Sequence, residues 1–139
     1  MNAPAIITAC ILLLIGCLHF YWACGGRWAM HYTIPTTTSQ QPTIAPGSFV
    51  TFVVAFLLFG AALLIMIQSD LLSLEELQPY VRIGCWICAI VFGIRSIGDF
   101  NYLGLFKRVK GTLFAKYDTK LFSPLCIWLS LNFFYVLLR

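Results

Sequence analysis

Residues 49–67 read FVTFVVAFLLFGAALLIMI and contain no charged side chain. A helix needs about 20 mostly apolar residues to cross the hydrocarbon core of a bilayer, and this stretch has that length. Backbone groups in hydrocarbon must be satisfied within a helix or a closed barrel, and a barrel strand would alternate apolar and polar residues. The stretch is continuously apolar, so it predicts a membrane-spanning helix.

Three further stretches are long and apolar enough to span a bilayer: residues 5–23, 81–98 and 121–138. The stretch 81–98 carries Arg82 and Arg95 near its two ends. The whole chain is 60% hydrophobic and only 10% charged, whereas soluble domains average about 25% charged residues. A soluble domain of 139 residues could not bury so much apolar surface. We therefore predict a single domain over residues 1–139, of all-α class: a polytopic membrane protein folded as a four-transmembrane-helix bundle.

Prolines mark the expected starts of two helices. Pro79 precedes the third span and is typical of a first helical turn. Ser123 and Pro124 resemble a helix cap followed by a first-turn proline, which predicts that the fourth helix starts late or kinks there.

Lysine and arginine are distributed unevenly between the two sides of the predicted bundle. The side with the first and third connections carries seven of them: Arg27, Arg95, Lys107, Arg108, Lys110, Lys116 and Lys120. The other side carries only Arg82 and Arg139. Because these residues favour the cytoplasmic side, we predict a multi-pass protein of the bacterial cytoplasmic (inner) membrane, N-out and C-out.

Ionisable residues near the inner ends of the first and third spans predict a polar cluster. His19 and Arg95 lie at similar predicted depth, and Asp99 follows Arg95 by four residues, so the two can pair if the helix continues. The cluster is either a cytoplasm-facing pocket or a buried Arg95–Asp99 ion pair, with His19 bonded to a carbonyl. The candidate residues are His19, Tyr21, Trp22, Arg27, Arg95, Asp99, Tyr102, Lys107 and Arg108.

Cys85 and Cys88 form a C-x-x-C motif, which is typical of thiol oxidoreductases. Cys85 lies beyond the first turn of its predicted helix and no second pair stands in an exterior loop, so buried packing thiols are the favoured interpretation. The sequence contains no phosphate-binding glycine loop and no H-E-x-x-H motif. We expect no cofactor, no metal and no nucleic acid as partner.

Three blocks of sequence resemble a family of small bacterial four-span membrane proteins known as a domain of unknown function. The first is HFYWACGGRW at residues 19–28, and the second is RSIGDFNYLGLFKR at residues 95–108. The third comprises Gly111-Thr112, Phe114-Ala115, Asp118 and Ser123-Pro124-Leu125-Cys126. The resemblance implies four helices and the bacterial cytoplasmic membrane, and it implies no activity.

The expected function is that of an integral inner-membrane protein that binds an amphipathic or anionic small molecule, or a lipid, at its cytoplasmic face. Its expected partners are the lipid bilayer, an anionic lipid or amphipathic ligand, and a second copy of the chain. The alternative is a small membrane enzyme that acts on a lipid-soluble substrate, with His19 or Asp99 in proton transfer. Thiol-redox and dimeric-transport functions are less favoured.

Overall fold

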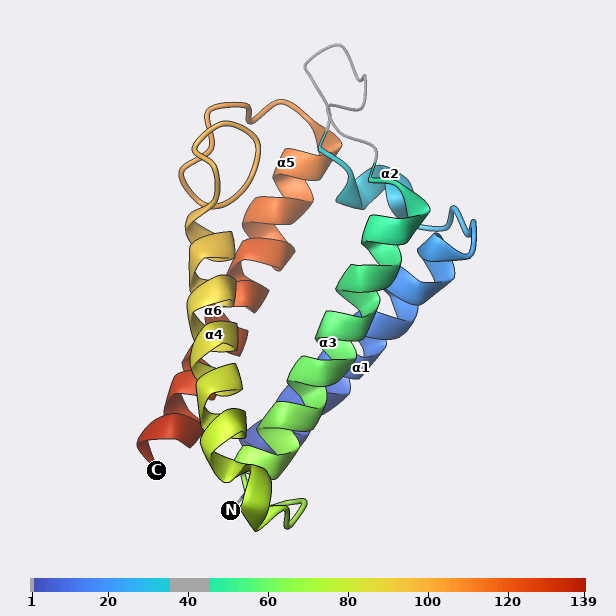
Figure 1. The fold of residues 1–139 in the computed structure, drawn as a ribbon. Helices are drawn as coiled ribbons and strands as arrows, with labels where there is room; N and C mark the ends of the chain where they lie inside the picture. Colours follow the sequence, from blue (N-terminus) through green and yellow to red (C-terminus); the bar gives the residue numbers. More distant parts are fainter. Residues whose placement is uncertain (1, 36–45) are drawn as a thin grey trace.

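The computed structural model describes residues 2–35 and 46–139, and every regular element within them is helical (Figure 1). Four helices are long and apolar enough to cross a membrane, as predicted, and the last of them runs without interruption over 26 residues, from Leu113 to Leu138. The elements are α1 (Ala3–Ala23), α2 (Met30–Thr33), α3 (Ser48–Gln68), a 3-10 turn (Glu75–Leu77), α4 (Gln78–Ile97), α5 (Leu113–Tyr117), a π-helical turn (Asp118–Phe122) and α6 (Ser123–Leu138).

The fourth long helix starts earlier than predicted. Its cap is Thr112, whose hydroxyl accepts a hydrogen bond of 3.1 Å from the amide of Ala115. Ser123 has helical backbone angles, φ −67° and ψ −47°, and makes no capping hydrogen bond, so the predicted cap was wrong. The regular α-helix α6 nevertheless begins at Ser123, after the π-helical turn. Pro124 has no N–H to continue the α-helical bonding, and the π-helical turn lies directly before Ser123.

Different segments of the chain gather at the two ends of the bundle (Figure 1). Asn2, Arg139 and the connection 69–77 lie together at one of them, which we call the terminal end, and the Arg139 guanidinium donates a hydrogen bond of 3.1 Å to the Asn2 side chain there. Residues 24–35 and 98–112 lie at the opposite end, which we call the loop end.

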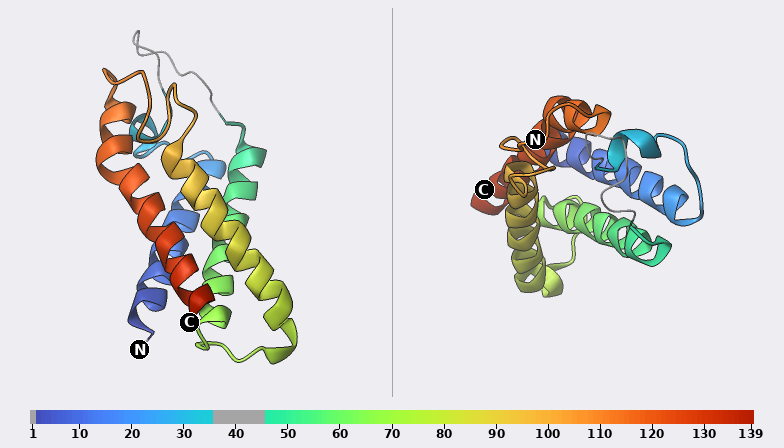
Figure 2. Two further views of the ribbon diagram at one scale, coloured as in Figure 1. Left: turned by 90° about the vertical axis from the view of Figure 1, so that its left-hand side faces the viewer. Right: turned by 90° about the horizontal axis from the view of Figure 1, so that it is seen from above.

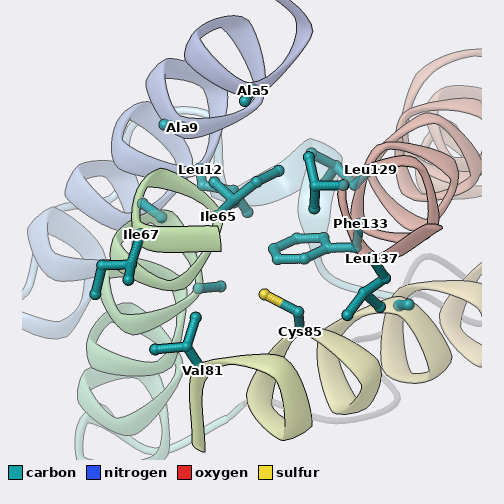
Figure 3. Packing of buried hydrophobic residues seen from close by; sticks show 14 residues of the cluster. Ala5, Ala9, Leu12, Ile65, Ile67, Val81, Cys85, Leu129, Phe133 and Leu137 are labelled. Carbon is teal, nitrogen blue, oxygen red and sulfur yellow. The ribbon is translucent and has the colours of Figure 1, made fainter. Parts of the chain in front are cut away.

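The hydrophobic core lies toward the terminal end and takes residues from all four long helices (Figure 3). Leu12, Ile65, Cys85 and Phe133, one from each helix, are fully buried in it. Small residues of α1, including Ala5 and Ala9, line the same core, and small residues let neighbouring helices approach closely.

The helices pack mainly as two pairs, α1 with α3 and α4 with α6. Toward the loop end the two pairs diverge, which is visible from the side in Figure 1 and from above in Figure 2. There α2 contacts α5, and the rings of Tyr32 and Tyr117 meet edge-on with their centroids 4.9 Å apart. Large apolar side chains such as Phe56 and Ile94 stay exposed on the outside of the bundle, as expected for a surface that contacts lipid.

Candidate functional site

A buried carboxylate, Asp118, organises the loop end. It is the first residue of the π-helical turn and is completely inaccessible to solvent. One carboxylate oxygen accepts a hydrogen bond of 3.0 Å from Arg95 Nη2, and the other accepts bonds of 2.8 Å from both Lys107 Nζ and the Gly104 amide. We call Arg95, Lys107 and Asp118 the ion cluster.

Lys107 is an unusual member of the ion cluster because its side chain is only 2% exposed. Its ammonium group also donates a hydrogen bond of 2.9 Å to the Gly104 carbonyl. A lysine is seldom buried unless its charge is paired, and here the Asp118 carboxylate supplies the pair. One carboxylate therefore joins α4, the loop 98–112 and the helix that starts at Leu113.

Two glycines allow the loop to fold back on itself. Gly98 and Gly104 have positive φ angles of 83° and 87°. A Cβ atom on Gly98 would lie 1.9 Å from the Leu103 carbonyl oxygen, and one on Gly104 would lie 2.2 Å from the Ile97 carbonyl oxygen. Only glycine fits such a close approach of two backbones. The fold-back brings the Gly104 amide and Lys107 to Asp118.

Asp99 is not the partner of Arg95, so the predicted Arg95–Asp99 pair was wrong. Gly98 ends α4 before Asp99, which takes it off the helix face. Its carboxylate accepts three backbone amide hydrogen bonds within the loop, from residues 101, 102 and 103, at 3.0, 2.8 and 2.8 Å. Although desolvation acts to raise it, these hydrogen bonds hold the pKa of Asp99 below its ordinary value.

His19 and Trp22 both hydrogen-bond to the backbone rather than to the ion cluster. His19 Nδ1 donates to the Ile15 carbonyl at 2.9 Å, as the structural alternative predicted. The Trp22 indole donates to the Trp28 carbonyl at 2.7 Å, which holds the turn after α1. The rings of His19 and Trp22 also meet edge-on at 5.0 Å.

The remaining sequence candidates lie outside the ion cluster. Tyr21, Arg27 and Arg108 are exposed and Tyr102 is half-buried. Of the nine predicted residues, the structure joins Arg95 and Lys107 through Asp118, a residue that the prediction did not include. A signal for Asp118 was present, because it is the single acid in the third motif block and has lysines on both sides.

A surface hollow of about 580 Å³ lies beside the ion cluster. Four of its lining residues are lysines and none is acidic. Lys107 is tied to Asp118, whereas Lys110, Lys116 and Lys120 are exposed and make no ion pair within the described part of the chain. We call this the lysine hollow, and it is lined by Leu105, Lys107, Lys110, Gly111, Thr112, Leu113, Ala115, Lys116, Thr119 and Lys120.

The terminal end has a smaller cavity of about 420 Å³ with a different lining. It includes both Asp70 and Arg139, together with uncharged polar groups such as Asn2 and Gln78. The two ends thus differ in charge. The terminal cavity is lined by both an acidic and a basic residue, whereas the charged residues that line the lysine hollow are all lysines.

The cysteines of the C-x-x-C motif form no disulfide within the described residues, and Cys85 is fully buried in the core. Its thiol lies 3.7 Å from the Leu64 carbonyl of α3 and serves as a packing group. Across residues 2–35 and 46–139, no group of three or more His, Cys, Asp or Glu side chains is placed to hold a metal ion.

The model of one protein family matches residues 12–133, and its description is "Protein of unknown function (DUF3995)". This match supports the prediction that the chain belongs to a family of unknown function. Neither a curated protein nor a solved structure matches the chain.

Proposed function

The chain belongs to the DUF3995 family, and we propose that it is a bacterial inner-membrane protein that binds the anionic head of an amphipathic molecule in the lysine hollow. In this proposal the loop end faces the cytoplasm and both termini lie outside. The ion cluster holds the hollow in shape, and the exposed lysines contact the ligand.

The observation that carries the proposal is the charge of the lysine hollow. The hollow is lined by Lys110, Lys116 and Lys120, and no carboxylate lies in its lining to balance their charge. Cations at the edge of a membrane attract anionic head groups, and each contributes about 1 kcal/mol. The volume of about 580 Å³ also lies within the range of small-molecule sites.

Apolar side chains beside the lysines favour a ligand with a hydrocarbon chain. On the helix Leu113–Leu138, Lys116 and Lys120 are each followed by an exposed apolar residue, Tyr117 and Leu121. The helix continues from there into its apolar half. A bound head group would therefore leave its chain beside Leu121, against the lipid-facing surface.

The distribution of positive charge supports the orientation. Seven lysines and arginines belong to the loop end and its flanking residues, against Arg82 and Arg139 at the terminal end. A phosphatase fused after Arg139 should therefore be active outside the cytoplasm. Activity of a cytoplasm-only reporter at the same position would contradict the orientation.

The alternative of a membrane enzyme has less support. His19 Nδ1 is engaged with the Ile15 carbonyl, and the Asp99 carboxylate accepts three amide hydrogen bonds. His19 Nε2 and the second Asp99 oxygen lie outside these bonds, but neither has a hydrogen-bonded side-chain partner among the described residues that could relay a proton.

Binding can be measured with short-chain lipids added to the purified protein. We expect dioctanoyl phosphatidylglycerol to bind and dioctanoyl phosphatidylcholine to bind much more weakly. The double variant Lys116→Gln with Lys120→Gln should weaken phosphatidylglycerol binding roughly thirtyfold, from about 1 kcal/mol for each lysine.

The matched control is Arg82→Gln with Arg139→Gln, which removes the same charge from the terminal end. It should bind phosphatidylglycerol as the wild type does. Equal affinity of the two double variants would overturn the lysine hollow as the site. Glycerol phosphate tests the apolar part of the proposal, because binding as tight as that of the lipid would remove the role of the hydrocarbon chain.

A further inference from the structure

Arg95 uses only part of its guanidinium group in the ion cluster. Nη2 donates to Asp118, whereas Nη1 is buried and has no hydrogen-bond partner among the residues that the structure describes. About a third of the side chain is exposed, but Nη1 itself is not in that part. A buried charged donor without an acceptor is unfavourable, so its surroundings should supply one.

Ser123 presents a second donor of the same kind. The residue is completely buried, and its hydroxyl has no partner in the described chain. Hydroxyls in helices commonly bond to the carbonyl four residues earlier, and Thr119 does so with Ala115 at 3.0 Å. Ser123 lacks this bond, so its hydroxyl is free to donate to another acceptor.

The two donors belong to the same part of the α4–α6 interface. Ser123 lies between Asp118 and Ser130 on the helix Leu113–Leu138. Asp118 is bonded to Arg95 of α4, and further along the same helix the Ser130 hydroxyl donates to the Ala89 carbonyl of α4. Ser123 therefore lies between two points at which this helix contacts α4, one turn along the helix from the carboxylate that binds Arg95.

The ion cluster also carries a surplus of charge. Arg95 and Lys107 contribute two positive charges, and Asp118 contributes one negative charge. Asp99, the carboxylate closest to Arg95 in sequence, is exposed and already bonded to three amides. One positive charge at the edge of the membrane-spanning region is thus without a buried counter-charge, which is costly.

From these donors and this charge we infer that the α4–α6 interface binds one small monovalent anion, of the halide class, between Arg95 Nη1 and the Ser123 hydroxyl. The anion accepts both hydrogen bonds and neutralises the ion cluster. This site is separate from the lysine hollow and does not depend on the proposed function.

Chloride is the probe for this site. Thermal unfolding of the purified protein should shift to higher temperature as chloride replaces gluconate at constant ionic strength, because a ligand that binds only the folded state stabilises it. The chloride midpoint is the chloride concentration that gives half of the full shift in unfolding temperature. Ser123→Ala should raise this midpoint about tenfold, as expected for the loss of one hydrogen bond to a charged group. Arg95→Lys keeps the charge but lacks the second nitrogen, and it should raise the midpoint similarly.

Ser130→Ala is the matched control, because Ser130 is a buried serine of the same helix whose hydroxyl already donates to the Ala89 carbonyl at 2.7 Å. It should lose stability and keep the wild-type chloride midpoint. Bromide should replace chloride and give an anomalous-scattering peak between Arg95 and Ser123 in crystals.

The inference would be overturned if the wild-type protein unfolded at the same temperature in chloride and in gluconate. It would also be overturned if Ser123→Ala had the same chloride midpoint as the wild type. The lysine variant Lys116→Gln with Lys120→Gln separates this site from the hollow. It should keep the chloride effect, and a loss of the effect in this variant alone would place the ion in the hollow and overturn the inference.

Discussion

The two ends of the bundle are held together by different forces. At the terminal end, apolar side chains from all four long helices meet around Phe133, whereas at the loop end a few hydrogen bonds converge on Asp118. Lipid is as apolar as a leucine side chain, so packing at the terminal end gains dispersion energy but little hydrophobic transfer energy. When a buried charged side chain loses its partner, lipid cannot supply the missing counter-charge. The loop end therefore depends on fewer residues, and each of them should matter more.

Asp118→Asn should be the most damaging single change. It leaves Lys107 and Arg95 without their shared carboxylate, and breaking a buried ion pair costs about 3–5 kcal/mol of unfolding free energy. Denaturant titration in one fixed detergent would measure the loss. Asp70→Asn at the terminal end is the control, because Asp70 is exposed, forms no ion pair with described residues and has a φ of 60° that asparagine tolerates.

The control should change the unfolding free energy by less than about 0.5 kcal/mol. If the two variants were equally stable, the ion cluster would not hold the loop end together, and the contrast between the ends would fail.

Gly98→Ala should have the second largest effect, about 2–3 kcal/mol, because it adds a Cβ at positive φ against the Leu103 carbonyl. The loop would have to open, and Lys107 would move away from Asp118. Gly111→Ala serves as the control. Gly111 lies in the same loop region, and the position that a Cβ atom would take on it has no neighbouring atom within 4 Å. The same denaturant titration applies, and equal losses in both variants would show that the fold-back is not required.

Phe133→Ala tests the terminal end and should cost less, about 1–2 kcal/mol, although the residue is fully buried. In a soluble core the same change costs about 3–5 kcal/mol; here the transfer part is largely missing because the unfolded helix stays in lipid. Phe56→Ala, at a 63% exposed position of α3, is the control and should be nearly neutral. A loss for Phe133→Ala larger than that for Asp118→Asn would reverse the order of the two ends.

The four long helices were predictable because each depends on local composition alone. Length and hydropathy are properties of contiguous residues, so residues 49–67 are sufficient to identify α3. The partner of Arg95 was less accessible, since spacing by four favours Asp99 only while the helix continues. Gly98, directly before Asp99, is a signal of a helix end and therefore favours a more distant carboxylate as the partner of Arg95.

The lysine hollow could not be derived from spacing. Its lysines belong partly to the loop 98–112 and partly to the helix Leu113–Leu138. The fold-back at Gly98 and Gly104 brings these two segments close together. The start of that helix was misplaced for a related reason. Thr112 and Ser123 are both acceptable caps by residue type, and the choice between them depends on the packing of residues 113–122 against the loop.

The smallest expected effect concerns Asp99 and is visible only in acid. Its pKa is lowered in the folded state because three backbone amides bond to the carboxylate. Its contribution to stability is therefore complete above the unfolded pKa, about 3.9, and is lost as pH falls from there through the folded pKa. The exposure of Asp99 keeps the contribution small.

Asp99→Asn supplies the non-titrating reference for this effect. The difference in unfolding temperature between wild type and this variant should stay constant from about pH 7 to about pH 5 and should shrink below about pH 4. A difference that persisted unchanged to pH 3, or that grew in acid, would mean that the amide hydrogen bonds do not favour the ionised carboxylate. Because Asp99 lies in the loop that carries Gly104 and Lys107, a confirmed effect would also show that this loop contributes to the stability of the whole bundle.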